Sequence, residues 1–175
     1  IYTRLLKNLP KKVSIIDLGC GVNGVNYNLF EKVGKQVDYF GVESVGQLID
    51  LTNAFFETNK IKNAIVINES LFNLEKIKKL ILQTKKPRVV FMLKVVDALE
   101  SLERDYTKSF LKEIVPLVDR VVISFATESW FSRKKFFVQR TWIIDFIKEQ
   151  GWHFIDDFNL SGERYLVFQG ISVVR

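Results

Sequence analysis

Short apolar runs rich in β-branched residues alternate along the chain with longer segments in which apolar residues recur every three or four positions. The short runs predict strands and the longer segments predict helices. The predicted strands cover residues 13–17, 37–43, 63–68, 88–93, 119–126, 152–158 and 164–173. The predicted helices cover residues 27–33, 45–59, 73–85, 100–115 and 136–151, and Gly151 is expected to cap the last of them. Five strand–helix units are therefore followed by two strands in succession.

This order predicts an α/β fold in which a doubly wound, mostly parallel sheet of seven strands carries helices on both faces. Residues 88–93 are continuously apolar, as expected of a strand in the middle of a parallel sheet. The last two strands are joined by "NLSGE", which is too short for a helix, so they should form an antiparallel hairpin. A terminal hairpin distinguishes the Rossmann-like class I methyltransferase fold from the dehydrogenase fold.

The composition narrows the class of protein. A chain of 175 residues suits a single domain, 1–175, with a full hydrophobic core. No apolar run approaches the roughly 20 residues of a membrane span, which argues against a membrane protein. Cys20 is the single cysteine, so no internal disulfide can form, and a reducing, cytoplasmic setting is expected. With one histidine as well, a Cys/His zinc site is disfavoured, and no metal is expected.

The first loop carries the strongest chemical signal. Residues 13–25 read "VSIIDLGCGVNGV", in which Gly19, Gly21 and Gly24 spell the dinucleotide pattern G-x-G-x-x-G. A dinucleotide places its pyrophosphate at the helix N-terminus and tolerates no nearby anion, yet Asp17 precedes the loop. S-adenosylmethionine has no phosphate and carries two cationic groups, so Asp17 favours that cofactor; a structural tie within the loop is the alternative. The loop residues predicted to bind it are Asp17, Gly19, Cys20, Gly21 and Asn23.

Polar residues also end the second and third strands. Glu43 can accept hydrogen bonds from ribose hydroxyls, which both cofactors share. In "NESLF", Asn68 or Glu69 can bind the exocyclic amine of adenine, with Glu69 preferred, and Leu71 or Phe72 can pack on the ring. The predicted cofactor residues beyond the first loop are Glu43, Ser44, Glu69, Ser70, Leu71 and Lys94.

Lys94 is the first polar residue after the fourth strand, at the edge of the sheet where such folds bind ligands. It is predicted to lie in the site, with a solvated surface position as the alternative. No His/Asp or Cys/His pair suggests a catalytic dyad, and no "NPPY"-like motif of amino-methylating enzymes occurs. His153 falls in a terminal strand, where a structural role is expected. No residue is therefore assigned as catalytic.

The segment after the fifth strand, residues 124–140, interleaves aromatic and basic side chains. Aromatic faces can stack on bases and cations can meet phosphates, so this segment predicts RNA binding. The net charge of +6 also favours a polyanionic partner, although a lysine-rich solvated surface would give the same charge. The predicted RNA-binding residues are Trp130, Arg133, Lys134, Lys135 and Arg140.

Three segments together resemble a known family. Residues 17–23, 91–105 and 121–135 are similar, in the same order, to motifs of the 16S rRNA guanine-N7 methyltransferases of the aminoglycoside-resistance (Arm/Rmt/Sgm) type. The resemblance implies a class I methyltransferase fold and RNA contact after the fifth strand. It also implies S-adenosylmethionine at Gly19, Gly21, Glu43, Glu69 or Ser70, and Leu71.

The expected function is therefore S-adenosylmethionine-dependent methylation of RNA, with ribosomal guanine N7 as the target. Two alternatives remain open, a small-molecule methyltransferase and a non-catalytic S-adenosylmethionine-binding partner subunit. An NAD-dependent oxidoreductase is disfavoured by Asp17 and by the terminal hairpin. The oligomeric state is not determined by the sequence.

Overall fold

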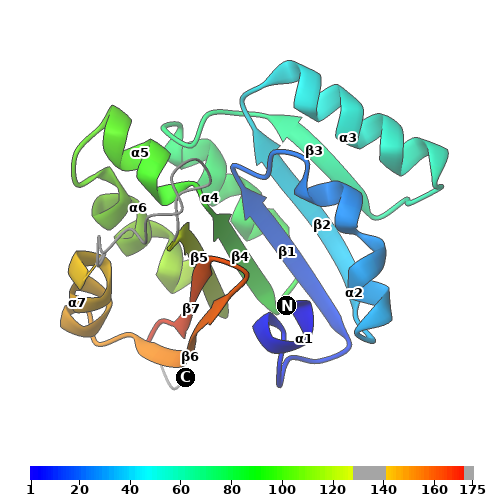
Figure 1. The fold of residues 1–175 in the computed structure, drawn as a ribbon. Helices are drawn as coiled ribbons and strands as arrows, with labels where there is room; N and C mark the ends of the chain where they lie inside the picture. The colour runs from blue at the N-terminus through cyan, green and yellow to red at the C-terminus, as the bar shows by residue number, and fades with distance from the viewer. Residues whose placement is uncertain (128–140, 172–175) are drawn as a thin grey trace.

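The computed structural model describes residues 1–127 and 141–171 and contains one seven-stranded sheet, in the order β3-β2-β1-β4-β5-β7-β6 (Figure 1). The strands are β1 (Lys12–Leu18), β2 (Gln36–Glu43), β3 (Ala64–Asn68), β4 (Arg88–Leu93), β5 (Arg120–Ala126), β6 (His153–Leu160) and β7 (Glu163–Gln169). Strands β1 to β5 pair in parallel, whereas β7 pairs antiparallel with both β5 and β6. The predicted mostly parallel sheet with a terminal antiparallel hairpin is confirmed.

Helices cover both faces of this sheet. They are α1 (Tyr2–Leu5), α2 (Asn28–Lys32), α3 (Gly46–Thr58), α4 (Leu74–Gln83), α5 (Val96–Leu102), α6 (Tyr106–Ile114) and α7 (Thr141–Glu149). Buried residues of α1, α2 and α3 pack with one face of the sheet, and those of α4 to α7 pack with the other. Alternate strand residues serve the two layers: Ile15 belongs to the first core and Ile16 to the second. This alternation explains why both faces of the central strands are apolar.

One predicted helix was wrong in its extent. Residues 100–115 form no single helix, because α5 ends at Leu102 and α6 begins at Tyr106. Asp105 between them adopts a left-handed backbone with φ of 62°. The carboxylate of Glu100 accepts hydrogen bonds from the backbone N–H groups of Asp105 and Thr107, each at 2.8 Å, and this stabilises the break. The predicted helix 136–151 is seen as α7, and its predicted start lies outside the described residues; Gly151, at φ of 69°, follows it as expected.

The N-terminal segment before β1 packs on the sheet, which the pattern of apolar residues did not predict. Tyr2, Leu5 and Leu6 are buried. The guanidinium group of Arg120 on β5 donates to the carbonyl oxygens of Leu5 and Lys7, at 2.8 and 2.9 Å. These bonds satisfy carbonyl groups at the end of α1 that have no partner within the helix. The segment is therefore held from a strand more than a hundred residues away in the sequence.

The first loop runs from β1 into a 3-10 turn, Asn23–Asn26, and this turn packs tightly on α3. A Cβ atom at Gly24 would lie 2.6 Å from Thr52 Cγ2 and 2.7 Å from Phe56 Cζ. The third glycine of G-x-G-x-x-G is therefore required for close packing between the turn and α3, and this requirement does not depend on which cofactor is bound.

We expect Gly24→Ala to lower the free energy of unfolding by about 1–3 kcal/mol, because the added methyl group overpacks the contact with α3. Gly46→Ala is the matched control, since a Cβ atom there meets nothing within 4 Å and the backbone is not left-handed. The control should be neutral or stabilising by up to about 1 kcal/mol. Urea unfolding measures both variants, and equal stability of the two would contradict this packing role.

Candidate functional site

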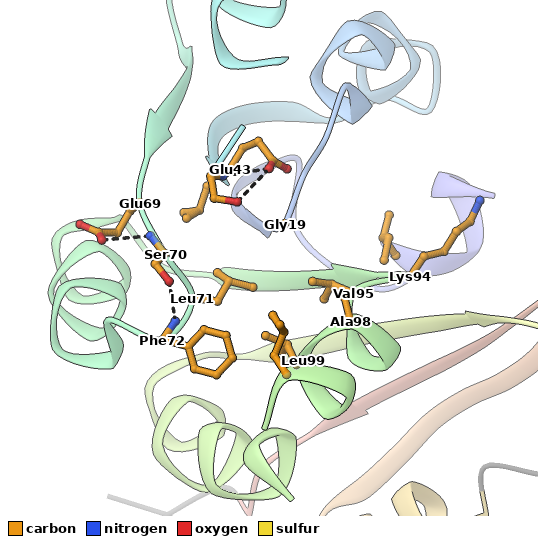
Figure 2. A pocket seen from close by; sticks show the side chains of 14 residues that line it. Gly19, Glu43, Glu69, Ser70, Leu71, Phe72, Lys94, Val95, Ala98 and Leu99 are labelled. Atoms are coloured by element: carbon orange, nitrogen blue, oxygen red, sulfur yellow. Dashed lines mark hydrogen bonds between the residues drawn. The ribbon is translucent and has the colours of Figure 1, made fainter. Parts of the chain in front are cut away.

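A pocket of about 320 Å³ opens at the edge of the sheet where the parallel strands β1 to β4 end (Figure 2). Ligands of open α/β sheets bind at this carboxyl edge. Polar residues line one part of it and apolar side chains of α5 line another. The lining residues are Gly19, Val42, Glu43, Ser44, Glu69, Ser70, Leu71, Phe72, Leu93, Lys94, Val95, Ala98, Leu99 and Leu102.

Asp17, at the end of β1, lies under the first loop and is only 1% exposed. Its Oδ2 atom accepts hydrogen bonds from the Tyr39 hydroxyl and from the side-chain amide of Asn23, both at 2.7 Å. Its Oδ1 atom is buried and has no hydrogen-bond partner. Burial raises the pKa of Asp17 to about 6, against the lowering effect of the two hydrogen bonds. A buried acceptor without a donor is costly, so this oxygen is suited to a polar or cationic group of a ligand.

Glu43, at the end of β2, holds the first loop in its conformation. One carboxylate oxygen accepts the backbone N–H of Gly21 at 2.8 Å. The other accepts the backbone N–H groups of Ser44 and Val45, at 2.8 and 3.1 Å. Glu43 is labelled in Figure 2. The carboxylate thus joins the ends of β1 and β2 and lines the pocket between them. An amide side chain has one acceptor oxygen and could not replace all three bonds.

The segment after β3 forms a second wall of the pocket. Leu71 and Phe72 point toward Leu99 of α5 (Figure 2), which makes an apolar slot. Glu69 turns back on its own segment: it accepts the backbone N–H of Ser70 at 3.0 Å and forms an ion pair with Lys76 at 2.8 Å. These partners lower the pKa of the Glu69 carboxyl group, with the Lys76 bond as the largest cause. Glu69 is therefore ionised, and part of its hydrogen-bonding capacity is already used.

Gly19 closes the pocket against the start of α5. A Cβ atom at this position would lie 2.6 Å from Val95 Cγ2, and its φ of +69° disfavours any other residue. The first loop can therefore approach α5 closely only with glycine at this position.

Lys94 follows β4 and joins the pocket to the terminal hairpin. It adopts a left-handed backbone, with φ of 58°, and its backbone N–H donates to the carbonyl of Ser124 on β5 at 3.0 Å. Its side chain forms an ion pair with Glu163, the first residue of β7. Glu163 also accepts the hydroxyl of Tyr165. Lys94 thus lies at the pocket and is paired with an acid that the sequence did not single out.

The predicted cofactor residues fall into two groups. Gly19, Glu43, Ser44, Glu69, Ser70, Leu71 and Lys94 line the pocket, whereas Asp17, Cys20, Gly21 and Asn23 form and support the loop at its side. Asn68, the alternative to Glu69, does not line it. The structure adds Val95, which precedes α5, and Ala98, Leu99 and Leu102 of α5. The spacing of these apolar residues after β4 is a helical pattern that the sequence offered. The predicted RNA-binding residues Trp130, Arg133, Lys134, Lys135 and Arg140 lie outside the described residues.

Two features are absent from the described residues, 1–127 and 141–171. No helix there is long and apolar enough to cross a membrane. No group of three or more His, Cys, Asp or Glu side chains is placed to hold a metal ion in that part of the chain.

The sheet order, the terminal hairpin and the pocket at the carboxyl edge define the Rossmann-like methyltransferase fold, and solved structures agree. The chain is similar to the 16S rRNA methylase ArmA, with a TM-score of 0.65, 19% identity and coverage of 97% of this chain and 80% of that one. It is similar to a SAM-dependent methyltransferase from Aquifex aeolicus, with a TM-score of 0.63, 13% identity and coverage of 94% and 86%.

A third similar structure is the bifunctional kinase-methyltransferase WbdD, with a TM-score of 0.64, 16% identity and coverage of 97% of this chain. The chain spans 37% of the length of that protein. No protein-family profile matches the sequence, and no curated protein sequence matches it. At these identities the likeness establishes the fold alone.

The raised pKa of Asp17 predicts a pH-dependent stability. Because its folded-state pKa is about 6 against an ordinary 3.8, the folded state holds a proton between these values that the unfolded state releases. The free energy of unfolding should therefore fall as the pH rises through this window. Asp17→Asn removes the charge and keeps an oxygen for both hydrogen bonds. We expect it to be more stable than wild type near neutral pH, by about 1–3 kcal/mol, with a flatter slope from about pH 4 to about pH 6.

Urea unfolding at a series of pH values measures this effect. Asp145→Asn, which changes an exposed carboxylate on α7, is the matched control and should keep the wild-type slope. An Asp17→Asn variant that is less stable than wild type near neutral pH would contradict the cost assigned to the buried charge.

Proposed function

We propose that this protein is an S-adenosylmethionine-dependent methyltransferase that acts on RNA, with guanine N7 of ribosomal RNA as its target. The observation that carries the cofactor assignment is the buried carboxylate of Asp17, whose Oδ1 atom has no partner. Glu43 adds a second carboxylate beside the same loop. Among the described side chains, neither carboxylate has an ion-pair partner. Two acids that accept hydrogen bonds but have no cationic partner among the described side chains favour a cationic ligand and disfavour a pyrophosphate.

The residues around the pocket fit this cofactor. Asp17 suits its cationic groups, Glu43 suits its ribose hydroxyls, and the slot between Leu71 and Leu99 suits its adenine ring. When bound, the cofactor supplies an electrophilic methyl group. The residues of the chain would then bind the cofactor, orient the acceptor toward its methyl group and exclude water from the pocket.

The target is proposed from the chemistry available at the pocket. Guanine N7 already carries a nucleophilic lone pair, so its methylation needs orientation and no general base. Among the residues that the structure describes, the pocket lining includes no histidine or cysteine, and the lysine that lines it, Lys94, is paired with Glu163. This arrangement supports an acceptor that reacts without proton removal.

RNA as the acceptor is supported by three observations. The net charge of the chain is +6. ArmA, which shares the fold, is a 16S rRNA methylase. The aromatic and basic residues predicted for RNA contact follow β5, which ends at the same edge of the sheet as the pocket. We therefore assign RNA contact to Trp130, Arg133, Lys134, Lys135 and Arg140.

The cofactor assignment predicts that S-adenosylhomocysteine binds in isothermal titration calorimetry and that NADH does not. Glu43→Gln should weaken this binding by about 10- to 100-fold, because one loop N–H loses its acceptor and a negative charge is removed. Glu57→Gln, an exposed change on α3, is the control and should bind as wild type does. Tight NADH binding without a response to S-adenosylhomocysteine would overturn the assignment.

The acceptor assignment predicts that a labelled methyl group passes from the cofactor to ribosomal RNA and is recovered as 7-methylguanosine after nucleoside analysis. Arg133→Glu with Lys134→Glu should weaken RNA binding in a salt-dependent way and leave cofactor affinity unchanged, since these residues are assigned to phosphates. Cofactor binding without label in any RNA would favour a small-molecule acceptor or a non-catalytic role.

A further inference from the structure

Tyr2 reaches the first loop from outside the strand–helix units that build the fold. It lies on α1 and is 6% exposed. Its ring packs against Phe30 at 4.5 Å and lies nearly parallel to Phe91 at 6.3 Å. A phenylalanine would pack in the same way. Packing of the ring therefore explains an aromatic residue at this position but does not explain the hydroxyl group of Tyr2.

That hydroxyl donates a hydrogen bond of 2.9 Å to Oδ1 of Asn23, in the turn that follows the first loop. The nitrogen of the same amide donates to Asp17 at 2.7 Å. An amide has one accepting end and one donating end, so a donor at its oxygen turns its nitrogen toward the carboxylate. The reversed amide would place an oxygen against Asp17 and repel it. Asn26 also approaches the amide oxygen, but at 3.5 Å and in an exposed position.

The charged and titratable groups around Asp17 make this orientation important. Tyr39 donates to the same carboxylate oxygen, while Glu43 and Cys20 add no donor to it. Burial, with the nearby Asp17, raises the pKa of Tyr2 to about 12, so its hydroxyl remains a donor near neutral pH. The buried carboxylate therefore depends on two donors, and one of them is oriented by Tyr2.

The segment that carries Tyr2 is anchored at several points. Arg4 forms two hydrogen bonds with Asp156 on β6, at 2.6 and 2.8 Å, and lies 3.9 Å from the ring centre of Phe158. Arg120 holds the carbonyl oxygen of Leu5 at 2.8 Å. A bidentate pair of this kind fixes geometry as well as adding energy. Tyr2 is thus presented to the loop by a segment tied to β5 and β6.

We infer that Tyr2 is a positioning residue of the cofactor site, which orients Asn23 and through it fixes Asp17 with one oxygen directed to the ligand. This inference rests on the proposed function, because it requires the ligand of Asp17 to be a cationic cofactor. The N-terminal segment then belongs to the cofactor site, although it contributes no lining residue to the pocket.

The test compares the affinity of wild type, Tyr2→Phe and Tyr27→Phe for S-adenosylhomocysteine, whose amino group is also cationic. Tyr2→Phe keeps the ring and should bind about 3- to 10-fold more weakly, the range expected for one lost hydrogen bond. Tyr27→Phe is the matched control, because its ring also packs on Phe30 and its hydroxyl donates to Val37 in the sheet at 2.5 Å. It should lose stability and keep its affinity.

A double-mutant cycle with Asn23→Ala tests whether Tyr2 acts through the amide. In the Asn23→Ala background, Tyr2→Phe should have almost no further effect on affinity, whereas independent contributions would add. The pH dependence of the affinity for S-adenosylhomocysteine is a second, independent test of the same role. Wild-type affinity should fall as the pH drops through the pKa of Asp17, about 6, and the midpoint should be higher in Tyr2→Phe because the ionised carboxylate is less well supported.

The outcomes are distinct. Failure of wild type to bind S-adenosylhomocysteine would overturn the proposed function and this inference with it. Binding by wild type with equal affinity and the same pH midpoint in Tyr2→Phe would overturn the inference alone. An additive cycle, or an equal loss of affinity in Tyr27→Phe, would also overturn it, since both would show a general structural effect.

Discussion

The carboxylate of Asp17 is buried almost completely from water, and the residues around it are arranged to donate hydrogen bonds to it. An isolated buried carboxylate is costly and is tolerated only with donors around it. Here the donors come from two places, Tyr39 on β2 and Asn23 in the turn after the first loop. Asn23 can donate to Asp17 only if the turn lies close to the end of β1. The close packing of Gly24 on α3 holds the turn in that position.

The pocket joins two parts of the sheet that are built differently. Strands β1 and β2 meet through Glu43, whose carboxylate collects three backbone N–H groups. On the other side, Lys94 after β4 is paired with Glu163 at the start of β7. The first arrangement leaves a negative site beside a glycine loop, and the second neutralises a lysine at the rim. The pocket therefore has a negative side at the ends of β1 and β2 and a charge-paired side at β4 and β7.

The N-terminal segment shows how a short piece of chain can be integrated into such a fold. Arg4, which belongs to this segment, binds the carboxylate of Asp156. Arg120 and Lys35 come from elsewhere in the fold and donate to carbonyl oxygens of the segment. The carbonyl groups at the end of a short helix and in an irregular loop have no backbone N–H partner. The bonds from Arg120 and Lys35 supply the hydrogen bonds that these carbonyl groups would otherwise lack. The segment completes one face of the sheet and contacts the first loop at the same time.

Hydrophobic periodicity determined the seven strands and their grouping into a mostly parallel sheet. The short connection "NLSGE" determined the terminal hairpin, and the glycine pattern with Asp17 determined the loop at which a nucleoside cofactor is expected. These features are local, because a strand or a glycine turn is specified by adjacent residues. The break between α5 and α6 was not predictable, since it depends on Glu100 accepting two backbone N–H groups across the turn. Tyr2 and Glu163 were missed for a similar reason. Their partners, Asn23 and Lys94, are distant in the sequence, and only the packed sheet brings each pair together.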